Sequence, residues 1–285
     1  MLELMALAVV GVLLVIGTIT DFKTREVPDW LNYAGIAAGV GIHLVAAVVA
    51  WDWHPLLDLA FGLGVFVPLG FLMYYGGQWG GGDAKAMMAI GSLLGLQGRL
   101  DHVGVAFLIN TLFMGALYGI VSVGIIALRN KKEFVPAFTK LAKARTFIIA
   151  RIAAIVLLLA FGALSFFVDD ALARIAFLIL AVFFPFIVYA FLFTKATESC
   201  MLRWVTPDKL TEGDWINKDV IVAGKRITGP KDLGITNEQI AKLQEYAKKH
   251  ALKVQVKDGI PFVPSFLLAF IATLMIGNPF LLAWF

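Results

Sequence analysis

The stretch LELMALAVVGVLLVIGTIT, residues 2–20, contains a single charged residue. A helix needs about 20 mostly apolar residues to cross the hydrocarbon core of a bilayer, so this stretch is long enough for one membrane span. It lacks the basic segment and the small-residue cleavage site that a removed signal peptide would carry. We therefore interpret it as a first span that the protein retains.

Seven further segments have the same apolar character: 30–51, 55–75, 83–97, 103–128, 146–168, 171–193 and 260–284. Hydrophobic residues make up 60% of the 285 residues and charged residues 15%. Soluble domains have roughly 45–50% apolar and about 25% charged residues, so this composition excludes an ordinary soluble protein. The sequence predicts an all-α polytopic membrane protein with about eight transmembrane helices, of which the segment 83–97 is the shortest.

Lys and Arg residues indicate the orientation of these spans. If the N-terminus lies outside, the inward connections contain Lys23, Arg25 and Lys85, and the stretch 129–145 adds six more basic residues. The outward connections at 52–54 and 169–170 contain none, and 98–102 contains only Arg99. Basic residues favour the cytoplasmic side of a membrane. We therefore expect a multi-pass protein of the cytoplasmic membrane with its N-terminus outside.

Residues 194–258 interrupt the apolar pattern, which divides the chain into a membrane domain at 1–193, a soluble module at 194–258 and a last helix at 259–285. Alternating residues at 219–222 and 252–256 predict short strands. Thr236 and Gln239 have the spacing of a capping box at the start of a helix. We expect a small cytoplasmic α/β module that serves packing or partner binding.

Two polar segments lie at the predicted inner surface. They are DFKTREVPDW (residues 21–30) and QWGGGDAK (residues 78–85), and they place Asp21 and Asp83 at the inner ends of two spans. A charged carboxylate near the apolar core costs on the order of 2.5–3.5 kcal/mol, so two at matching depth require an explanation. Taken alone, Asp21 could pair with Lys23 or Arg25, and Asp83 could be a helix N-cap.

The residues around the two aspartates favour a shared site instead. Gly80, Gly81 and Gly82 permit close backbone approach and positive φ values immediately before Asp83. Pro28 prevents the first helix from continuing into the next span. Both carboxylates would then face one cleft at the cytoplasmic surface.

Paired carboxylates can hydrolyse a peptide bond with a water molecule. At close range both cannot ionise cheaply, so the pair shares a proton. The ionised member takes a proton from the water, and the protonated member donates to the scissile carbonyl. This chemistry predicts an aspartic protease site that needs no metal or other cofactor. The chain's single cysteine, Cys200, also excludes an internal disulfide and a cysteine-based zinc cluster.

The two segments resemble the paired signatures of the type IV prepilin peptidase family, which includes the archaeal preflagellin peptidases. The first signature runs from Asp21 through Lys23 to Pro28 and Asp29, and the second ends at Asp83 after Gly80 and Gly82. The two aspartates are 62 residues apart (83 − 21). The similarity continues through Lys85 to Gly95, and we assign the recognisable core to residues 1–128.

This resemblance implies that Asp21 and Asp83 are the catalytic pair. Lys85, Pro28 and the three glycines would support them, together with Lys23 and Asp29 of the first signature. Family substrates are pilin- or archaellin-like precursors, cut between a short basic leader and an apolar helix at the cytoplasmic membrane surface. The lipid bilayer is the other expected partner; no nucleic acid is expected, and the oligomeric state stays open.

Bacterial members of the family often carry a zinc-binding cysteine insert and also N-methylate the product. This chain has one cysteine and no methyl-donor site that we identify. It therefore resembles the archaeal, cleavage-only branch, and no N-methyltransferase activity is expected.

A proline-containing segment, GIPFVP at residues 259–264, precedes the last span. We favour the interpretation that Pro261 and Pro264 fix the entry of a helix. The alternative is a strand that holds the substrate, because presenilin-like proteases place a proline-containing segment beside their catalytic pair.

Two other functions would also use paired membrane aspartates. A signal-peptide-peptidase or presenilin-like intramembrane protease would combine the glycine-rich motif with a Tyr-Asp pair, which this sequence lacks. An ion-coupled transporter could use Asp21 and Asp83 as coupling sites. No inverted repeat is evident, however, and both acids lie near an interface, so both alternatives rank below the leader peptidase.

Overall fold

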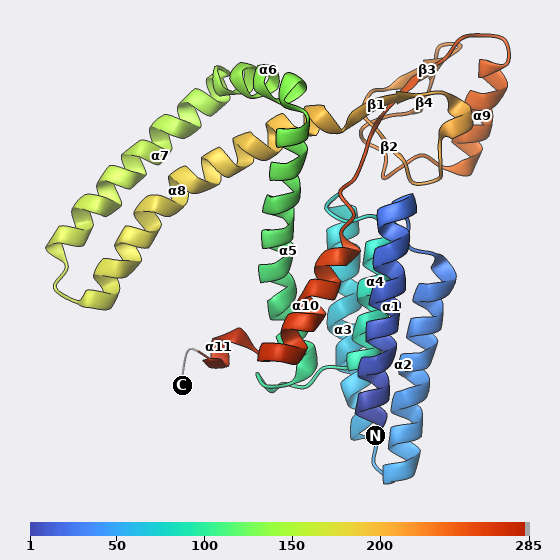
Figure 1. Cartoon of the computed structure of the whole chain (residues 1–285), viewed down its shortest axis with the longest axis vertical. Coiled ribbons are helices and arrows are strands. Elements are labelled where there is room, and N and C mark those ends of the chain that lie inside the picture. Colours follow the sequence, from blue (N-terminus) through green and yellow to red (C-terminus); the bar gives the residue numbers. More distant parts are fainter. Residues whose placement is uncertain (283–285) are drawn as a thin grey trace. The chain divides into compact units, whose positions relative to one another are not determined.

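The computed structural model describes residues 1–282 (Figure 1). Its helices are α1 (Leu2–Thr24), α2 (Asp29–Ala50), α3 (His54–Tyr75), α4 (Gly81–Leu94), α5 (Val103–Arg129), α6 (Lys131–Ala142), α7 (Arg145–Leu164), α8 (Ala171–Thr197), α9 (Asn237–Ala247), α10 (Val263–Ile276) and α11 (Pro279–Leu282). The short 3₁₀ turns are η1 (Ser165–Phe167), η2 (Glu198–Met201) and η3 (Pro207–Lys209). The strands are β1 (Leu202–Val205), β2 (Trp215–Ile216), β3 (Val220–Val222), β4 (Lys225–Thr228) and β5 (Val254–Lys257).

Within the described residues, seven helical segments are long and apolar enough to cross a membrane. They are Leu2–Thr24, Asp29–Ala50, His54–Tyr75, Val103–Arg129, Arg145–Phe167, Ala171–Met201 and Val263–Leu281. Each coincides with an expected span, and the polytopic all-α membrane fold is confirmed.

The expected span at 83–97 is the exception. It forms α4, which has 14 residues. At about 1.5 Å per residue this helix is roughly 21 Å long, against a hydrocarbon core of about 30 Å. It begins at Gly81 and ends at Leu94, because the C-cap Gly95 has a φ of 61°, which stops a right-handed helix.

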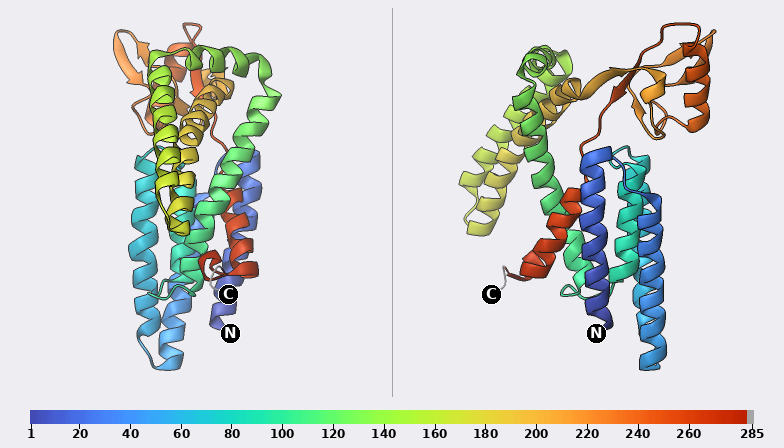
Figure 2. Two further views of the ribbon diagram at one scale, coloured as in Figure 1. Left: turned by 90° about the vertical axis from the view of Figure 1, so that its left-hand side faces the viewer. Right: turned by 45° about the vertical axis from the view of Figure 1, so that its right-hand side comes forward.

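Contacts divide the chain into two compact units, and the first consists of Met1–Ile120, Val205–Val254 and the residues from Asp258 onward. Helices α1 to α4 run side by side in this unit (Figure 2). The short helix α4 packs against α1, α2 and α3, and nearly all of its residues after Lys85 are buried. A helix buried on every face explains why α4 is apolar although it is too short to span.

Small residues let the helices approach α4 closely. A Cβ on Gly39 of α2 would overlap the backbone of Ser92, and one on Gly91 would overlap Phe66 of α3. Ser92 also donates a hydrogen bond of 2.9 Å to the carbonyl of Ile36. Such close contact between glycine-containing faces is typical of helix pairs in membranes. The core that results contains the buried rings of Phe66, Phe107 and Phe266.

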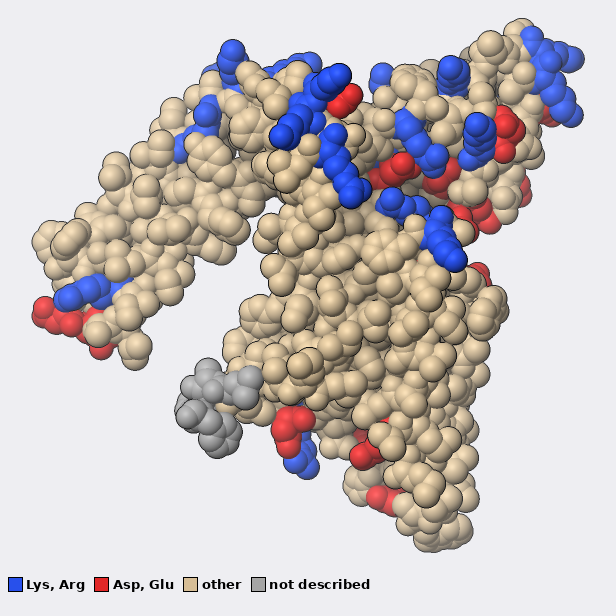
Figure 3. Space-filling view, viewed as in Figure 1, with Lys and Arg blue, Asp and Glu red and all other residues tan. Residues whose placement is uncertain are grey.

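The polar segment forms the small α/β structure expected from its pattern. Its strands make a three-stranded sheet in the order β1-β5-β2 and a separate antiparallel β3-β4 hairpin, in which Val222 faces Lys225 across the turn. Thr236 caps α9 and forms the predicted capping box with Gln239. The predicted strands at 219–222 and 252–256 correspond to β3 and β5. In Figure 3, charged side chains lie over this module and at helix ends, leaving the middle of the first unit's helices uncharged.

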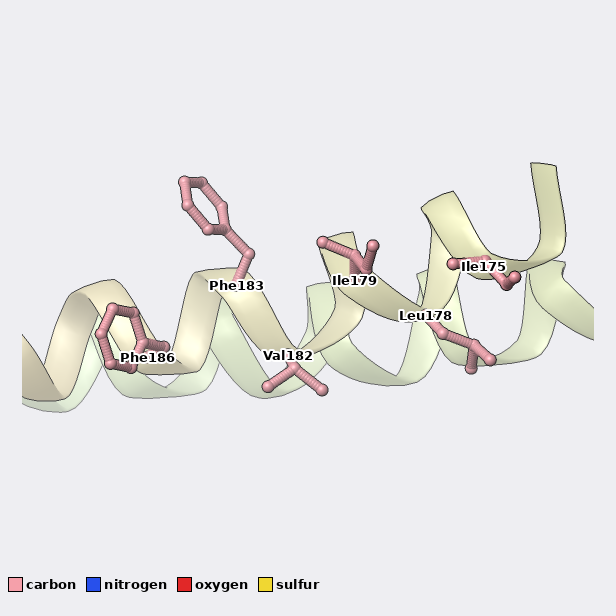
Figure 4. A pocket seen from close by; sticks show the side chains of 6 residues that line it. All are labelled: Ile175, Leu178, Ile179, Val182, Phe183 and Phe186. Atoms are coloured by element: carbon pink, nitrogen blue, oxygen red, sulfur yellow. The ribbon is translucent and has the colours of Figure 1, made fainter. Parts of the chain in front are cut away.

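The second unit consists of Val121–Trp204 and Gln255–Lys257. In it α7 and α8 pack together, with the rings of Phe161 and Phe184 stacked at 5.8 Å. Part of the basic stretch 129–145 forms the helix α6, which packs against α8 through Phe134. Apolar side chains of α8 line a shallow groove (Figure 4): Ile175, Leu178, Ile179, Val182, Phe183 and Phe186.

The two units are defined by contacts between residues, whereas the domain boundaries expected at 193/194 and 258/259 are defined by the polarity of the sequence. Those domain boundaries stay a prediction.

Candidate active site

Asp21 lies in the last turn of α1 and is buried, with 5% of its surface exposed. Its Oδ2 accepts a 3.0 Å hydrogen bond from the backbone N–H of Val263, the first residue of α10. Val263 is fully buried as well. A helix N-terminus presents free N–H groups and a partial positive charge, so α10 holds the Asp21 carboxylate in a defined position.

Asp83 is the third residue of α4 and is half-buried. Its Oδ2 accepts a 3.0 Å hydrogen bond from the backbone N–H of Gly80, which is the N-cap of the helix. The interpretation of Asp83, taken alone, as the N-cap of this helix is therefore wrong. Asp83 closes the first turn from inside the helix, because a carboxylate at this position reaches back to the capping residue.

The fold brings the two aspartates together. Asp21 is at the C-terminal end of α1 and Asp83 at the N-terminal end of α4, and these two helices pack against each other. Gly82, the neighbour of Asp83, packs on Val27 in the loop that follows α1. Two acidic residues from distant parts of the sequence therefore lie at adjoining helix ends.

The three glycines at 80–82 have only part of the role expected for them. Positive φ values occur at Gly77 and Gly95 but at none of the three glycines 80–82, so the expectation of positive φ there is wrong. Close approach is the reason for Gly82 instead. A Cβ on Gly82 would lie 3.1 Å from the backbone nitrogen and 3.2 Å from the Cβ of Val27. The second signature thus packs directly on the first.

An ion pair also joins the two signatures. The Nζ of Lys85 lies 2.6 Å from Oδ1 of Asp29 and 5.6 Å from the ring centre of Tyr33. Pro28 is the N-cap of α2, with a φ of −58° that suits a helix start. Lys23 is exposed in the last turn of α1. The N-terminal parts of α2 and α4 are therefore connected.

The segment before α10 lies against the site. The Nη1 of Arg25 donates to the carbonyl of Gly259 over 2.5 Å. Pro261 is buried, and Pro264 lies in the first turn of α10, where the fixed φ of proline is favourable. The substrate-strand role of this segment stays a prediction.

Aromatic residues connect α10 with the loop that leads to the glycine run. The buried Trp79 packs against Phe262 at 5.7 Å and edge-on against Phe266 at 5.1 Å. On the module side, Trp215 contacts the position where Gly77 would carry a Cβ, at 3.1 Å. The loop 76–80 is therefore held by two segments that follow residue 204.

Sequence reasoning missed two of these contributors, the backbone amide of Val263 and the side chain of Asn32. Asn32 is in the second turn of α2, is fully buried, and has its Nδ2 3.5 Å from the carbonyl oxygen of Gly82. A backbone amide leaves no signal in the sequence. The signal for Asn32 was a lone polar residue inside an apolar segment.

Comparison with known proteins gives a consistent result. The profile of the type IV leader peptidase family matches residues 8–120. A preflagellin peptidase of Methanococcus maripaludis is 29% identical over 87 residues, which cover 30% of this chain and 37% of that protein. The aligned part thus spans little more than a third of that relative. No solved structure matches.

The matched segment contains both aspartates, the ion pair of Lys85 and Asp29, and the glycine run. Residues 8–120 of this chain are thus similar to the type IV leader peptidase family, and the expected resemblance to its archaeal preflagellin peptidase branch is confirmed.

Proposed function

We propose that this protein is a membrane aspartic endopeptidase that removes class III signal peptides from type IV pilin-like or archaellin-like precursors. The observation that carries the proposal is that Asp21 and Asp83 lie where the C-terminal end of α1 adjoins the N-terminal end of α4. The similarity of residues 8–120 to the leader peptidases supports it. The name of the related protein, a preflagellin peptidase, suggests the substrate class.

The reaction follows from the two carboxylates. One ionised carboxylate takes a proton from a water molecule, whose oxygen attacks the carbonyl carbon of the scissile peptide bond. The other, protonated carboxyl donates its proton to the carbonyl oxygen as that oxygen gains charge. The tetrahedral intermediate then breaks its C–N bond, and a proton passes to the leaving amine. The two carboxyl groups together accept and donate the protons of the reaction. The proton transfers therefore need no metal ion.

The surrounding groups would hold the two carboxyl groups in fixed positions. The N-terminus of α10 orients Asp21 through the Val263 amide, while Asp83 is fixed by the N–H of Gly80. The ion pair of Lys85 and Asp29 would keep the first turns of α2 and α4 together. A misplacement of about 1 Å in such a site can lower a rate by about 10²-fold, so these contacts matter even without touching substrate.

The site would lie at the cytoplasmic face of the membrane, with the N-terminus outside. The six basic residues of 129–145 support this orientation through the preference of Lys and Arg for that side. At this depth an apolar precursor helix would remain in the bilayer while its leader reached the two aspartates from the water.

The test is cleavage of pilin-like and archaellin-like precursors co-expressed with the protein, with loss of the leader measured by mass spectrometry. Asp21→Asn and Asp83→Asn should each lower cleavage by at least about 10²-fold, the range of general acid–base catalysis. Asp101→Asn, an exposed aspartate paired with Arg99, is the matched control and should cleave normally. Normal cleavage by either Asn variant at position 21 or 83, in folded protein, would refute the assignment.

A further inference from the structure

Asn32 stands out among the buried polar residues of the described chain. It lies on α2 in an apolar setting, next to the buried Leu31 and one turn after Asp29, and none of its surface is exposed. Its Nδ2 is directed at the carbonyl oxygen of Gly82 at 3.5 Å. That carbonyl belongs to the peptide group that joins Gly82 to Asp83.

The other half of the Asn32 amide is unpaired. Its Oδ1 is buried and has no hydrogen-bond partner. Leaving a buried acceptor unpaired is unfavourable, and an apolar side chain of similar shape would avoid the loss. Stability of the fold therefore gives no reason for an asparagine at this position.

Asn110 provides the contrast within the same unit. It is also buried, with 2% of its surface exposed, and its Nδ2 donates to Thr273 Oγ1 at 3.0 Å and to the carbonyl of Gly277 at 2.9 Å. These bonds join α5 to the end of α10. Asn110 thus has the pairing expected of an asparagine that stabilises a helix contact.

We propose that Asn32 is a positioning residue for Asp83. The inference rests on the proposed function and adds a residue to its site. Besides the backbone hydrogen bond from the Ala84 N–H to the Gly80 carbonyl, three contacts hold the backbone 80–83: the bond from Gly80 to Asp83, the packing of Gly82 on Val27, and the amide of Asn32. Only the third is a polar side-chain contact from another helix. It restrains rotation of the peptide group before Asp83, and so the direction in which that carboxyl points.

The physical signature of this role is an opposite effect on stability and on rate. Asn32→Leu removes the unpaired oxygen together with the contact to Gly82. We expect its melting temperature to equal or exceed that of the unmodified protein, while kcat falls by at least 10-fold and KM stays within twofold. A merely structural asparagine would lose stability when replaced, and its kcat per folded molecule would be unchanged.

Two further variants complete the experiment. Asn32→Ala introduces no bulk that could clash, and it should show the same loss of kcat. It therefore replaces Asn32→Leu in the experiment if the leucine variant fails to fold. Asn110→Leu is the control, and it should lower the melting temperature while the folded fraction keeps a normal kcat. If both Asn32 variants cleave within twofold of the unmodified protein, or lose activity only in proportion to unfolding, Asn32 does not position Asp83.

An activity-free measurement separates this inference from the proposed function. Cysteines placed at positions 21 and 83, in a Cys200→Ser background, report on the approach of the two side chains through their rate of disulfide formation. Asn32→Leu should slow that rate by several-fold, and Asn110→Leu should leave it unchanged. An unchanged rate with Asn32→Leu would refute the positioning role, whether or not the unmodified protein cleaves a pilin-like precursor.

Discussion

Gly82→Ala tests how the two signatures are packed. The new Cβ would lie 3.1 Å from the nitrogen and 3.2 Å from the Cβ of Val27. Carbon atoms in good contact are about 3.5–4.0 Å apart, so the two segments must separate by roughly 0.3 Å or more. Asp83 is the next residue and would move with the first turn of α4.

The expected magnitudes follow from that displacement. If about 1 Å costs about 10²-fold in rate, a few tenths of an ångström should lower kcat by roughly 3- to 10-fold. Overpacking costs about 1–3 kcal/mol. Alanine in place of glycine returns about 0.5–1 kcal/mol in a helix. The net loss of stability should therefore be at most about 2.5 kcal/mol, and the effect on rate should exceed what unfolding explains.

The assay is single-turnover cleavage of a pilin-like precursor by purified protein, with the melting temperature measured on the same samples. Gly41→Ala is the matched control, because its Cβ would meet no atom within 4 Å. That variant should gain stability and cleave normally. Normal turnover by Gly82→Ala at normal stability would show that close packing of the two signatures is not what positions Asp83.

The remaining predictions concern the ion pair, the core and the orientation. Asp29→Asn and Lys85→Met should show a coupling of only about 0.2–1 kcal/mol in a double-mutant cycle of stability, since 58% and 35% of the two side chains are exposed; a coupling several times larger would mean that the pair is effectively buried. Phe66→Ala should lower the free energy of unfolding by about 3–5 kcal/mol, because Phe66 is fully buried against Phe107; denaturant unfolding checks this, and a loss under 1 kcal/mol would contradict the assigned core. In a Cys200→Ser background, Lys132→Cys should react with a membrane-impermeant thiol reagent only from the cytoplasmic side. Asp169→Cys should react only from the outside. The reverse labelling pattern would contradict the predicted orientation.

Local patterns in the sequence were sufficient for the spans and for the candidate aspartates. An apolar run of about 20 residues is unstable in water whatever surrounds it, so its location in a bilayer is a local property. The capping box of Thr236 and Gln239 is local in the same sense, and the structure contains it. Asp21 and Asp83 were identifiable because each is a charged residue beside an apolar segment, within a short pattern of neighbours.

Patterns of this kind failed where contacts decide the outcome. The short helix α4 resembles a span in composition, but its apolar residues face three other helices rather than lipid. The glycines 80–82 suggested positive φ, whereas Gly82 is required by its contact with Val27. Composition reports that a residue avoids water or lacks a side chain, and only the packed structure reports which neighbour makes that necessary.

The sequence by itself determined that this chain is a polytopic membrane protein, and it predicts two acids near one membrane surface, because hydrophobicity and charge act over a few neighbouring residues. Tertiary structure alone decided what holds those acids: an amide of α10 that is 242 residues from Asp21, and the side chain of Asn32 beneath the peptide before Asp83. Hydrogen bonds and close contacts act over a few ångströms in space, and distance along the chain does not reveal which atoms come that near.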